Sequence, residues 1–215
     1  MPTIESYKLR TKKNNLFLRV SKGHFATNHS HTNYYIDVTT QKTRLSEATA
    51  VAEELVGYYS ANTIVDTIIC LDGTAVIGAC LARELTRSGF VNMNAHQTIY
   101  VVTPEHITGS QLIFRDSNRP MVEGKNVLIL AASVTTGYTA KSAVEAINYY
   151  GGRVAGIASI FATVDECCGI PVRSIFNPKD DLSDYASYQS HDCPMCRSGK
   201  KIDALVNSFG FSKLV

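Results

Sequence analysis

The chain has 215 residues, a formal net charge of +2, 45% hydrophobic residues and 19% charged residues. This is the composition of an ordinary globular protein that can bury one full core. The basic residues are scattered except at residues 8–13 and 197–201, which argues against an extended nucleic-acid-binding face. No apolar run has the roughly 18 to 20 residues that span a bilayer, and no signal-like segment is present, so we expect a cytoplasmic protein without a membrane partner.

The first forty residues have a mixed character. We expect a short helix up to Val20, followed by Gly23-His24-Phe25 and a polar stretch that ends in Tyr34-Tyr35-Ile36-Asp37. Residues 1–43 are therefore interpreted as an N-terminal hood segment attached to the core.

Residues 44–59 carry apolar side chains at three- and four-residue spacing, which predicts a helix with one buried face. Thr43 or Ser46 is the candidate N-cap, because a hydroxyl can accept a hydrogen bond from the first turn. The predicted buried face consists of Leu45, Ala48, Val51, Ala52, Leu55 and Val56.

Apolar strand-like runs alternate with helical patterns along the middle of the chain. Strands are predicted at 63–71, 98–102, 126–131, 154–161 and 172–176, and helices at 75–87 and 138–150. This alternation is typical of α/β proteins with a parallel sheet. We expect a single domain in which residues 44–180 form a parallel sheet of about five strands with helices on both faces, followed by a C-terminal arm at residues 181–215.

A polar interval from Pro104 to Pro120 lacks clear periodicity. Connections of this length are uncommon unless they serve as lids or stay mobile. A hairpin through Gln111 to Phe114 is the alternative, and both readings stay open.

The strand-to-helix junction at residues 127–140 carries the most functional information. Unpaired N–H groups and the positive end of a helix favour a phosphate, and Gly137 allows the backbone to approach it closely. Threonine and glycine are also ordinary capping residues, so a plain capped turn is the alternative. The candidate phosphate-binding residues are Thr135, Thr136, Gly137, Tyr138 and Thr139.

This junction resembles the signature of type I phosphoribosyltransferases, and of their orotate phosphoribosyltransferase branch in particular. That signature is four apolar residues, two acids, two further residues and then Thr-Thr-Gly-x-Ser/Thr, and it holds at residues 127–130 and 135–139. The resemblance implies the type I fold, a homodimer, a small-molecule ribose-phosphate ligand and, if the chain is catalytic, Mg²⁺.

Two segments near the chain ends resemble the same branch. Residues 23–25 and 31–37 are similar to the family's N-terminal region near the base, and residues 192–199 are similar to the tail of one subgroup. Tyr34 and Tyr35 are base-side candidates because aromatic faces stack on bases, while burial is the alternative role for both rings.

The run Leu71-Asp72-Gly73-Thr74 resembles the pyrophosphate loop of the family. A carboxylate suits Mg²⁺, so Asp72 is a candidate for positioning that ion. The alternative role of Asp72 is to cap the following helix.

The sequence departs from the family where the two acids should hold the ribose hydroxyls, because Ala131 and Ala132 occupy these places. Losing two charged hydrogen bonds at roughly 1.5 to 3 kcal/mol each removes on the order of 3 to 6 kcal/mol of ribose binding. This corresponds to a factor of about 10² to 10⁴ in affinity or rate.

A second departure concerns the long loop, where the family carries an Arg-Lys-x-x-Lys type motif over pyrophosphate. This chain has no lysine there before Lys125, and Arg115 and Arg119 are the strong cations of the interval. Two hypotheses follow: a phosphoribosyltransferase that tolerates these losses, or a catalytically inactive regulator or subunit that binds a nucleotide or sugar phosphate.

Cys193 and Cys196 form a Cys-x-x-Cys pair for which Cys167, Cys168 or His191 could supply further zinc ligands. Zinc sites usually show a second such pair, so we expect reduced thiols and no metal.

Three histidines, His24, His29 and His31, cluster within eight residues of the N-terminal segment. They form either a patch that faces a ligand or metal, or an ordinary exposed polar loop.

Overall fold

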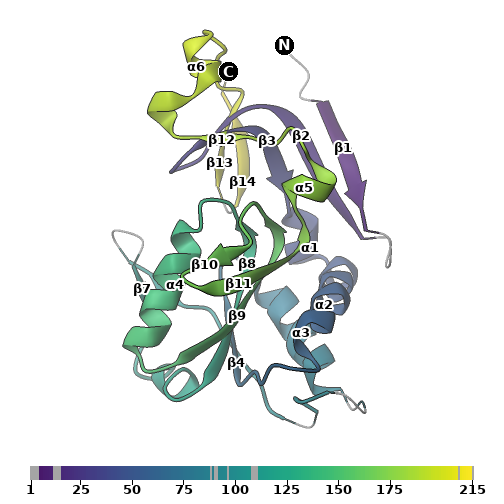
Figure 1. Ribbon diagram of the computed structural model, residues 1–215, viewed down its shortest axis with the longest axis vertical. Helices are drawn as coiled ribbons and strands as arrows, with labels where there is room; N and C mark the ends of the chain where they lie inside the picture. Colours follow the sequence, from purple (N-terminus) through teal and green to yellow (C-terminus); the bar gives the residue numbers. More distant parts are fainter. Residues whose placement is uncertain are drawn as a thin grey trace. The chain divides into compact units, whose positions relative to one another are not determined.

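The computed structural model describes residues 5–11, 16–87, 89, 92–95, 97–107, 111–207 and 209–214. The chain divides into two compact units, a terminal unit built from Met1–Thr40 and Phe176–Val215 and a core unit built from Gln41–Ile175 (Figure 1). No helix in the described ranges is long and apolar enough to cross a membrane. The division into hood, core and arm at residues 43 and 180 stays a prediction.

The core unit is built on a six-stranded sheet in the order β10-β11-β9-β8-β4-β5. Strands β5, β4, β8 and β9 are parallel to one another, whereas β10 pairs antiparallel with β11. Their bounds are β4 Thr67–Cys70, β5 Tyr100–Val102, β8 Asn126–Val134, β9 Arg153–Ala162, β10 Glu166–Cys167 and β11 Ile170–Phe176. The predicted α/β fold with a parallel sheet is confirmed.

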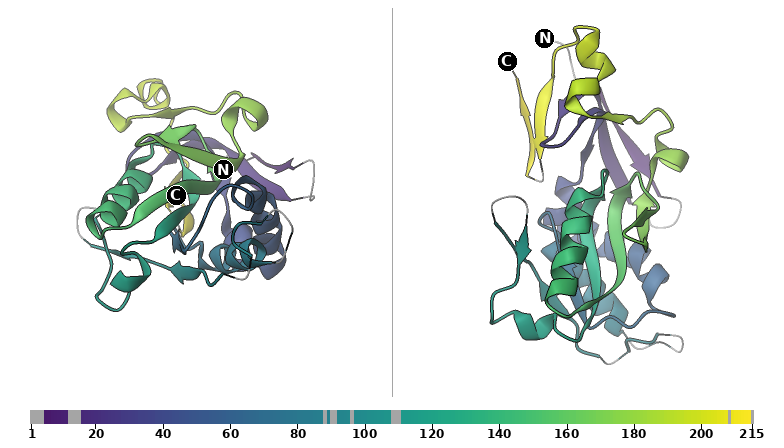
Figure 2. Two further views of the ribbon diagram at one scale, coloured as in Figure 1. Left: turned by 60° about the horizontal axis from the view of Figure 1, so that its bottom comes forward. Right: turned by 60° about the vertical axis from the view of Figure 1, so that its left-hand side comes forward.

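Helices cover both faces of this sheet. α4 (Tyr138–Tyr149) lies on one face, and α2 (Leu45–Tyr59) and α3 (Ala75–Thr86) lie on the other (Figures 1 and 2). Alternate residues of β8 join the apolar cluster that includes α4, as the two-residue period of a strand requires. α3 approaches β4 closely, which the absence of a side chain at Gly78 allows. A Cβ added there would collide with the Cys70 sulfur.

The start of α2 differs from the prediction. Neither Thr43 nor Ser46 caps this helix; the N-cap residue is Arg44, which makes no side-chain cap hydrogen bond. Leu45 is 67% exposed, because it occupies the first helical position, before the buried face begins. Tyr59 takes a place on that face at the other end of the helix.

The polar interval after β5 forms a hairpin. β6 (Glu105–His106) pairs antiparallel with β7 (Leu112–Ile113), and a short 3₁₀ helix, η1 (Arg119–Met121), follows. Of the two readings that the sequence left open, the hairpin is confirmed. The two arginines of the interval are both ion-paired: Arg115 with Glu105 at 2.7 Å and Arg119 with Glu123 at 3.2 Å.

The terminal unit contains a second sheet in the order β12-β3-β2-β13-β14, with β1 paired to β2. Its strands are β1 Glu5–Arg10, β2 Phe17–Ala26, β3 His31–Asp37, β12 Ser187–Tyr188, β13 Ala204–Asn207 and β14 Gly210–Lys213. The short helix expected up to Val20 is wrong. Leu16, Leu18 and Val20 are buried while Arg19 is exposed, which is the two-residue period of a strand.

Short helical turns connect the remaining segments. They are α1 Thr39–Thr43, α5 Pro178–Asp181, η2 Ser190–Asp192 and α6 Pro194–Arg197. Phe25, Tyr35 and Ala204 form an apolar cluster within the terminal unit. All six cysteines of the chain are free thiols.

Candidate functional site

The two segments that the sequence singled out follow neighbouring strands of the core sheet. From β4 the chain continues to β5 on one side, and from β8 it continues to β9 on the other. Ligands of parallel α/β sheets bind at such a switch point, beyond the carboxyl ends of the strands. The loop Leu71–Thr74 and the loop at residues 135–137 both leave the sheet at this point.

The loop after β8 ends in a helix start that has no side-chain cap. Gly137 is the N-cap residue of α4 and has φ +74°, in the left-handed region that favours glycine. The first helical hydrogen bond runs from the Lys141 N–H to the Gly137 carbonyl at 2.8 Å. The N–H groups of Thr139 and Ala140 therefore have no partner within the helix.

The threonine hydroxyls beside this helix start are also unused. Within the described ranges, the hydroxyls of Thr135, Thr136 and Thr139 make no hydrogen bond to the protein. Thr136 is exposed, and Thr135 and Thr139 are partly exposed. A capped turn would use such a hydroxyl to accept a helical N–H. The geometry at residues 135–139 therefore favours an anion-binding site, the anion seat, over a plain capped turn.

Two residues that the sequence analysis did not assign to this loop, Thr163 and Cys167, hold it in place from the protein side. The Thr163 hydroxyl donates to the Thr135 carbonyl at 2.7 Å, and the Cys167 thiol donates to the Gly137 carbonyl at 3.7 Å. Thr163 follows β9 directly, so the predicted end of that strand was the signal that could have found it. These contacts hold the loop carbonyls against the protein.

Ala131 and Ala132 lie at the end of β8 and are 2% and 3% exposed. Ala131 belongs to the apolar cluster that includes α4. The backbone N–H of Ala132 lies close enough to the carboxylate of Asp72 to lower its pKa. An acid from the neighbouring loop thus lies beside one of the positions where the two acids are missing.

Asp72 is the most unusual residue of the site. Its φ is +53°, a left-handed conformation, and the Lys42 ammonium donates to its carbonyl at 3.0 Å. Burial raises the pKa of its carboxyl, and Lys42, His106 and the Ala132 N–H act in the opposite direction. α3 has no side-chain cap, so the capping alternative for Asp72 is not what the structure shows. Nothing in the sequence pattern pointed to Lys42 or His106.

The other residues of the loop after β4 differ in their exposure. Leu71 and Thr74 are buried, whereas Gly73 is exposed. The Thr74 hydroxyl donates to the Leu71 carbonyl at 2.8 Å and to the Leu130 carbonyl at 3.0 Å. Its side chain therefore holds the loop to β8, and the side chain available to a ligand is that of Asp72.

Tyr34 and Tyr35 lie in the terminal unit, where both rings are buried. The Tyr34 hydroxyl donates to the Asp184 carboxylate at 2.8 Å, and the Tyr35 ring contacts Phe211 at a centroid distance of 5.2 Å. Both rings are therefore buried, as the alternative role proposed from the sequence required. Their role beside a base stays a prediction.

The raised pKa of Asp72 predicts how stability depends on pH. Between the unfolded pKa, about 4, and the higher native pKa, the native state binds more protons than the unfolded chain, so the free energy of unfolding falls as pH rises through this window. Asp72→Asn keeps an acceptor for the Ala132 N–H and cannot ionise. We expect this variant to be more stable than the parent at pH 7, with the difference closing as pH falls towards about 4.

Urea unfolding between pH 4 and pH 7 measures this difference. Asp116→Asn, at an exposed turn position, is the control and should follow the parent. A stability difference for Asp72→Asn that stays constant across this range would contradict the buried, protonation-linked carboxyl.

The comparisons with known proteins agree with this geometry. No known family model matches the chain. It is similar to the orotate phosphoribosyltransferase of Caldanaerobacter subterraneus, with 26% identity over 187 residues that cover 84% of this chain and 86% of the relative. It is also similar to the orotate phosphoribosyltransferase of a Thermoanaerobacter species, with 29% identity over 189 residues and the same coverage of 84% and 86%.

Solved structures show the same likeness in the fold. The UMP synthase of Leishmania donovani matches with a TM-score of 0.53 and 18% identity over 75% of this chain and 34% of that one. The orotate phosphoribosyltransferase of Mycobacterium tuberculosis, solved with 5-phospho-alpha-D-ribosyl 1-diphosphate, matches with a TM-score of 0.51 and 17% identity over 69% and 82%. The chain thus has the fold of the type I phosphoribosyltransferases, and over most of its length its sequence is similar to orotate phosphoribosyltransferases.

Proposed function

We propose that the chain binds a 5′-phosphorylated ribose ligand, either phosphoribosyl pyrophosphate or a nucleotide, with its phosphate at the start of α4. The observation that carries this proposal is the helix start at Gly137, which has no side-chain cap and lies beside three unused threonine hydroxyls. Backbone N–H groups at a helix start bind phosphate through hydrogen bonds and through the positive end of the helix dipole. The sequence similarity to orotate phosphoribosyltransferases supports a ribose phosphate in particular.

The binding function does not require the two missing acids. The methyl groups of Ala131 and Ala132 cannot accept a hydrogen bond from ribose, so the phosphate contributes a larger share of the affinity here than in a protein that has both acids. A nucleotide-binding or sugar-phosphate-binding regulator is the simplest function for such a site.

Phosphoribosyl transfer is the second candidate, and the position of Asp72 favours it. Its carboxylate lies beside Ala132, where it can stand in for one of the missing acids. Mg²⁺ prefers oxygen ligands and is often held by one carboxylate together with substrate phosphates, a requirement that Asp72 fits. When bound, the ion would neutralise charge on the departing pyrophosphate. The ammonium of Lys42, which holds the Asp72 carbonyl, would keep this loop in place.

Two measurements on one preparation test the proposal. Titration calorimetry with ribose 5-phosphate and phosphoribosyl pyrophosphate measures binding, and pyrophosphate release with Mg²⁺ and a panel of bases measures transfer. Binding without turnover identifies a regulator, and turnover identifies a transferase. Sedimentation of the same sample tests the homodimer that the resemblance implies.

Thr136→Val locates the site in both measurements. We expect weaker binding of both ligands, because the exposed hydroxyl is lost while the side-chain volume is kept. Thr86→Val, at the end of α3, is the matched control and should leave binding unchanged. The proposed anion seat would be rejected if neither ligand bound to the parent protein, or if Thr136→Val left their binding unchanged.

A further inference from the structure

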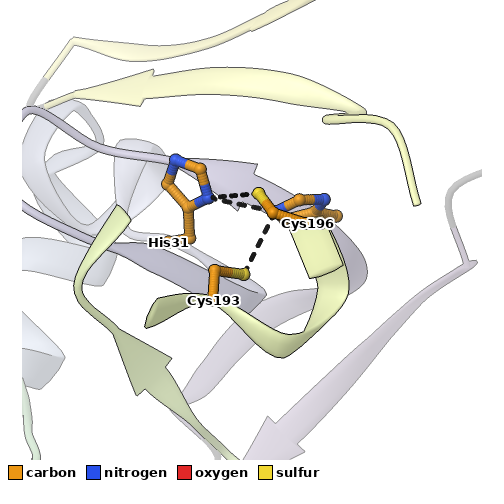
Figure 3. A group of neighbouring side chains, drawn as sticks. His31, Cys193 and Cys196 are labelled. Carbon is orange, nitrogen blue, oxygen red and sulfur yellow. Dashed lines mark hydrogen bonds between the residues drawn. The ribbon is translucent and has the colours of Figure 1, made fainter. Parts of the chain in front are cut away.

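Four potential metal ligands converge within the terminal unit, far in sequence from the anion seat at residues 135–139. They are His24 in β2, His31 in β3, Cys193 just before α6 and Cys196 within α6. Their ligand atoms all lie within 4.8 Å of one another. Figure 3 shows the ring of His31 directed at the sulfur of Cys196, with Cys193 beside them.

The distances between these atoms are close to the edges of a zinc tetrahedron. His24 Nε2 lies 3.2 Å from His31 Nδ1, 3.5 Å from Cys193 Sγ and 3.6 Å from Cys196 Sγ, and Cys196 Sγ lies 3.3 Å from His31 Nδ1. Zinc bonds of about 2.05 Å to nitrogen and about 2.3 Å to sulfur give tetrahedral edges of about 3.3 Å between nitrogens and about 3.5 Å between nitrogen and sulfur.

The hydrogen bond on the far side of the His24 ring fixes its tautomer. His24 Nδ1 lies 2.9 Å from the Lys200 carbonyl and 3.2 Å from the Lys201 carbonyl. A carbonyl can only accept, so Nδ1 carries the proton and donates it. The lone pair is then on Nε2, the atom that faces the other three ligands, and zinc-binding histidines are oriented in this way by a partner on the second ring nitrogen.

The backbone around His24 is held as tightly as its ring. The pairing of β2 with β3 shifts register between Lys22 and Phe25, and such a bulge redirects the side chains within it. The His24 N–H donates to the Asp203 carboxylate at 2.7 Å, and the Asp203 N–H donates to the His24 carbonyl at 2.7 Å. His24 and Cys193 are both 0% exposed, so half of the cluster lies in the interior of the unit.

We propose that His24, His31, Cys193 and Cys196 bind one Zn²⁺ in a structural site. Two sulfur and two nitrogen donors select zinc over Mg²⁺ or Ca²⁺, which prefer oxygen. Four protein ligands complete a tetrahedron and leave no position for a substrate, as in structural rather than catalytic zinc sites. This inference is independent of ligand binding at Gly137.

The ion would fix a part of the chain that has little regular structure of its own. Between β12 and β13 the regular elements are η2, with 3 residues, and α6, with 4 residues. Isolated helices of this length are not stable in water. Bound zinc would attach this segment to β2 and β3, which lie up to 172 residues away along the chain.

Metal analysis of the tag-free protein, purified with zinc present and then dialysed, is the first test. We expect one zinc per chain and a lower melting temperature after treatment with a strong chelator. Cys196→Ser and His31→Gln should each weaken zinc affinity by at least roughly 100-fold, because loss of even an outer-shell partner costs 10- to 100-fold. Cys168→Ser, which removes an exposed thiol outside the cluster, is the matched control and should keep one zinc per chain.

Cobalt replacement keeps the test decisive if a variant fails to fold. The parent protein, stripped by the chelator and reloaded with Co²⁺, should show the intense visible absorption of a tetrahedral ion and a thiolate-to-cobalt charge-transfer band. A parent protein that takes up neither metal, a Cys193–Cys196 disulfide in freshly purified protein, or a Cys196→Ser variant with unchanged zinc affinity would each overturn the proposal.

Discussion

Gly137→Ala is expected to weaken binding of ribose 5-phosphate by at least tenfold. Gly137 has φ +74°, and an L residue in this region costs about 1 to 2 kcal/mol. A Cβ there would meet the Cys167 sulfur at 3.6 Å, which is an ordinary contact, so backbone strain is the main effect. Relaxing that strain rotates the first turn of α4 and turns its N–H groups away from the phosphate. Calorimetric titration measures the loss of affinity.

Gly124→Ala separates this effect from a general loss of stability. Gly124 has φ +70° and no atom within 4 Å of an added Cβ. It precedes β8, whereas the anion seat follows that strand. We expect both variants to lose about 1 to 2 kcal/mol of folding free energy, and only Gly137→Ala to lose ligand. Equal loss of affinity in the two variants would show that Gly137 serves the fold and not the ligand.

Restoring the two acids is expected to have the second large effect. The double change Ala131→Asp, Ala132→Asp should tighten binding of ribose 5-phosphate by about 10²-fold, because each carboxylate can accept charged hydrogen bonds from the ribose hydroxyls. This is the lower end of the range for two such bonds. The new carboxylate at residue 132 would lie beside Asp72, and like charges at close range oppose ionisation.

The same double change should destabilise the fold. Ala131 is 2% exposed within an apolar cluster, and a buried polar group without a partner costs about 1 to 3 kcal/mol. Urea unfolding with and without ribose 5-phosphate measures both effects. Inorganic phosphate is the control ligand, because it has no ribose and its affinity should not rise. If ribose 5-phosphate binds no more tightly than to the parent, residues 131 and 132 do not face the ribose.

The parallel core could be predicted because its elements are long and periodic. The strand at 126–131 and the helix at 138–150 were expected from local pattern, and they appear as β8 and α4 with ends shifted by a few residues. The N-terminal strands could not be separated from a short helix, because the apolar residues around Val20 are too few to distinguish the two periods. Burial against β3 and β1 decides this segment, and it is a property of the folded sheet.

The candidate site was predictable to the extent that its residues are neighbours in sequence. The Thr-Thr-Gly run and the loop around Asp72 were recognised from local motifs. The contact between Asp72 and Ala132 was not, since it depends on two loops that meet after β4 and β8 pair. The four proposed metal ligands were not predicted as one group for the same reason: the Cys193–Cys196 pair and the histidines around His24 were considered separately, because His24 lies 169 residues from Cys193 along the chain.

The terminal unit is assembled from two segments that lie on either side of the core unit in the sequence, so it cannot be completed until the second segment has been synthesised. β1 to β3 leave the ribosome well before β13, which pairs with β2. Until then these early strands have unpaired edges, which attract other extended chains. The core unit is continuous in sequence and can fold while the nascent chain is still tethered, because domains generally fold as units in the order in which they emerge. Termination of translation after β11 would therefore leave the core sheet complete and β1 to β3 open to aggregation.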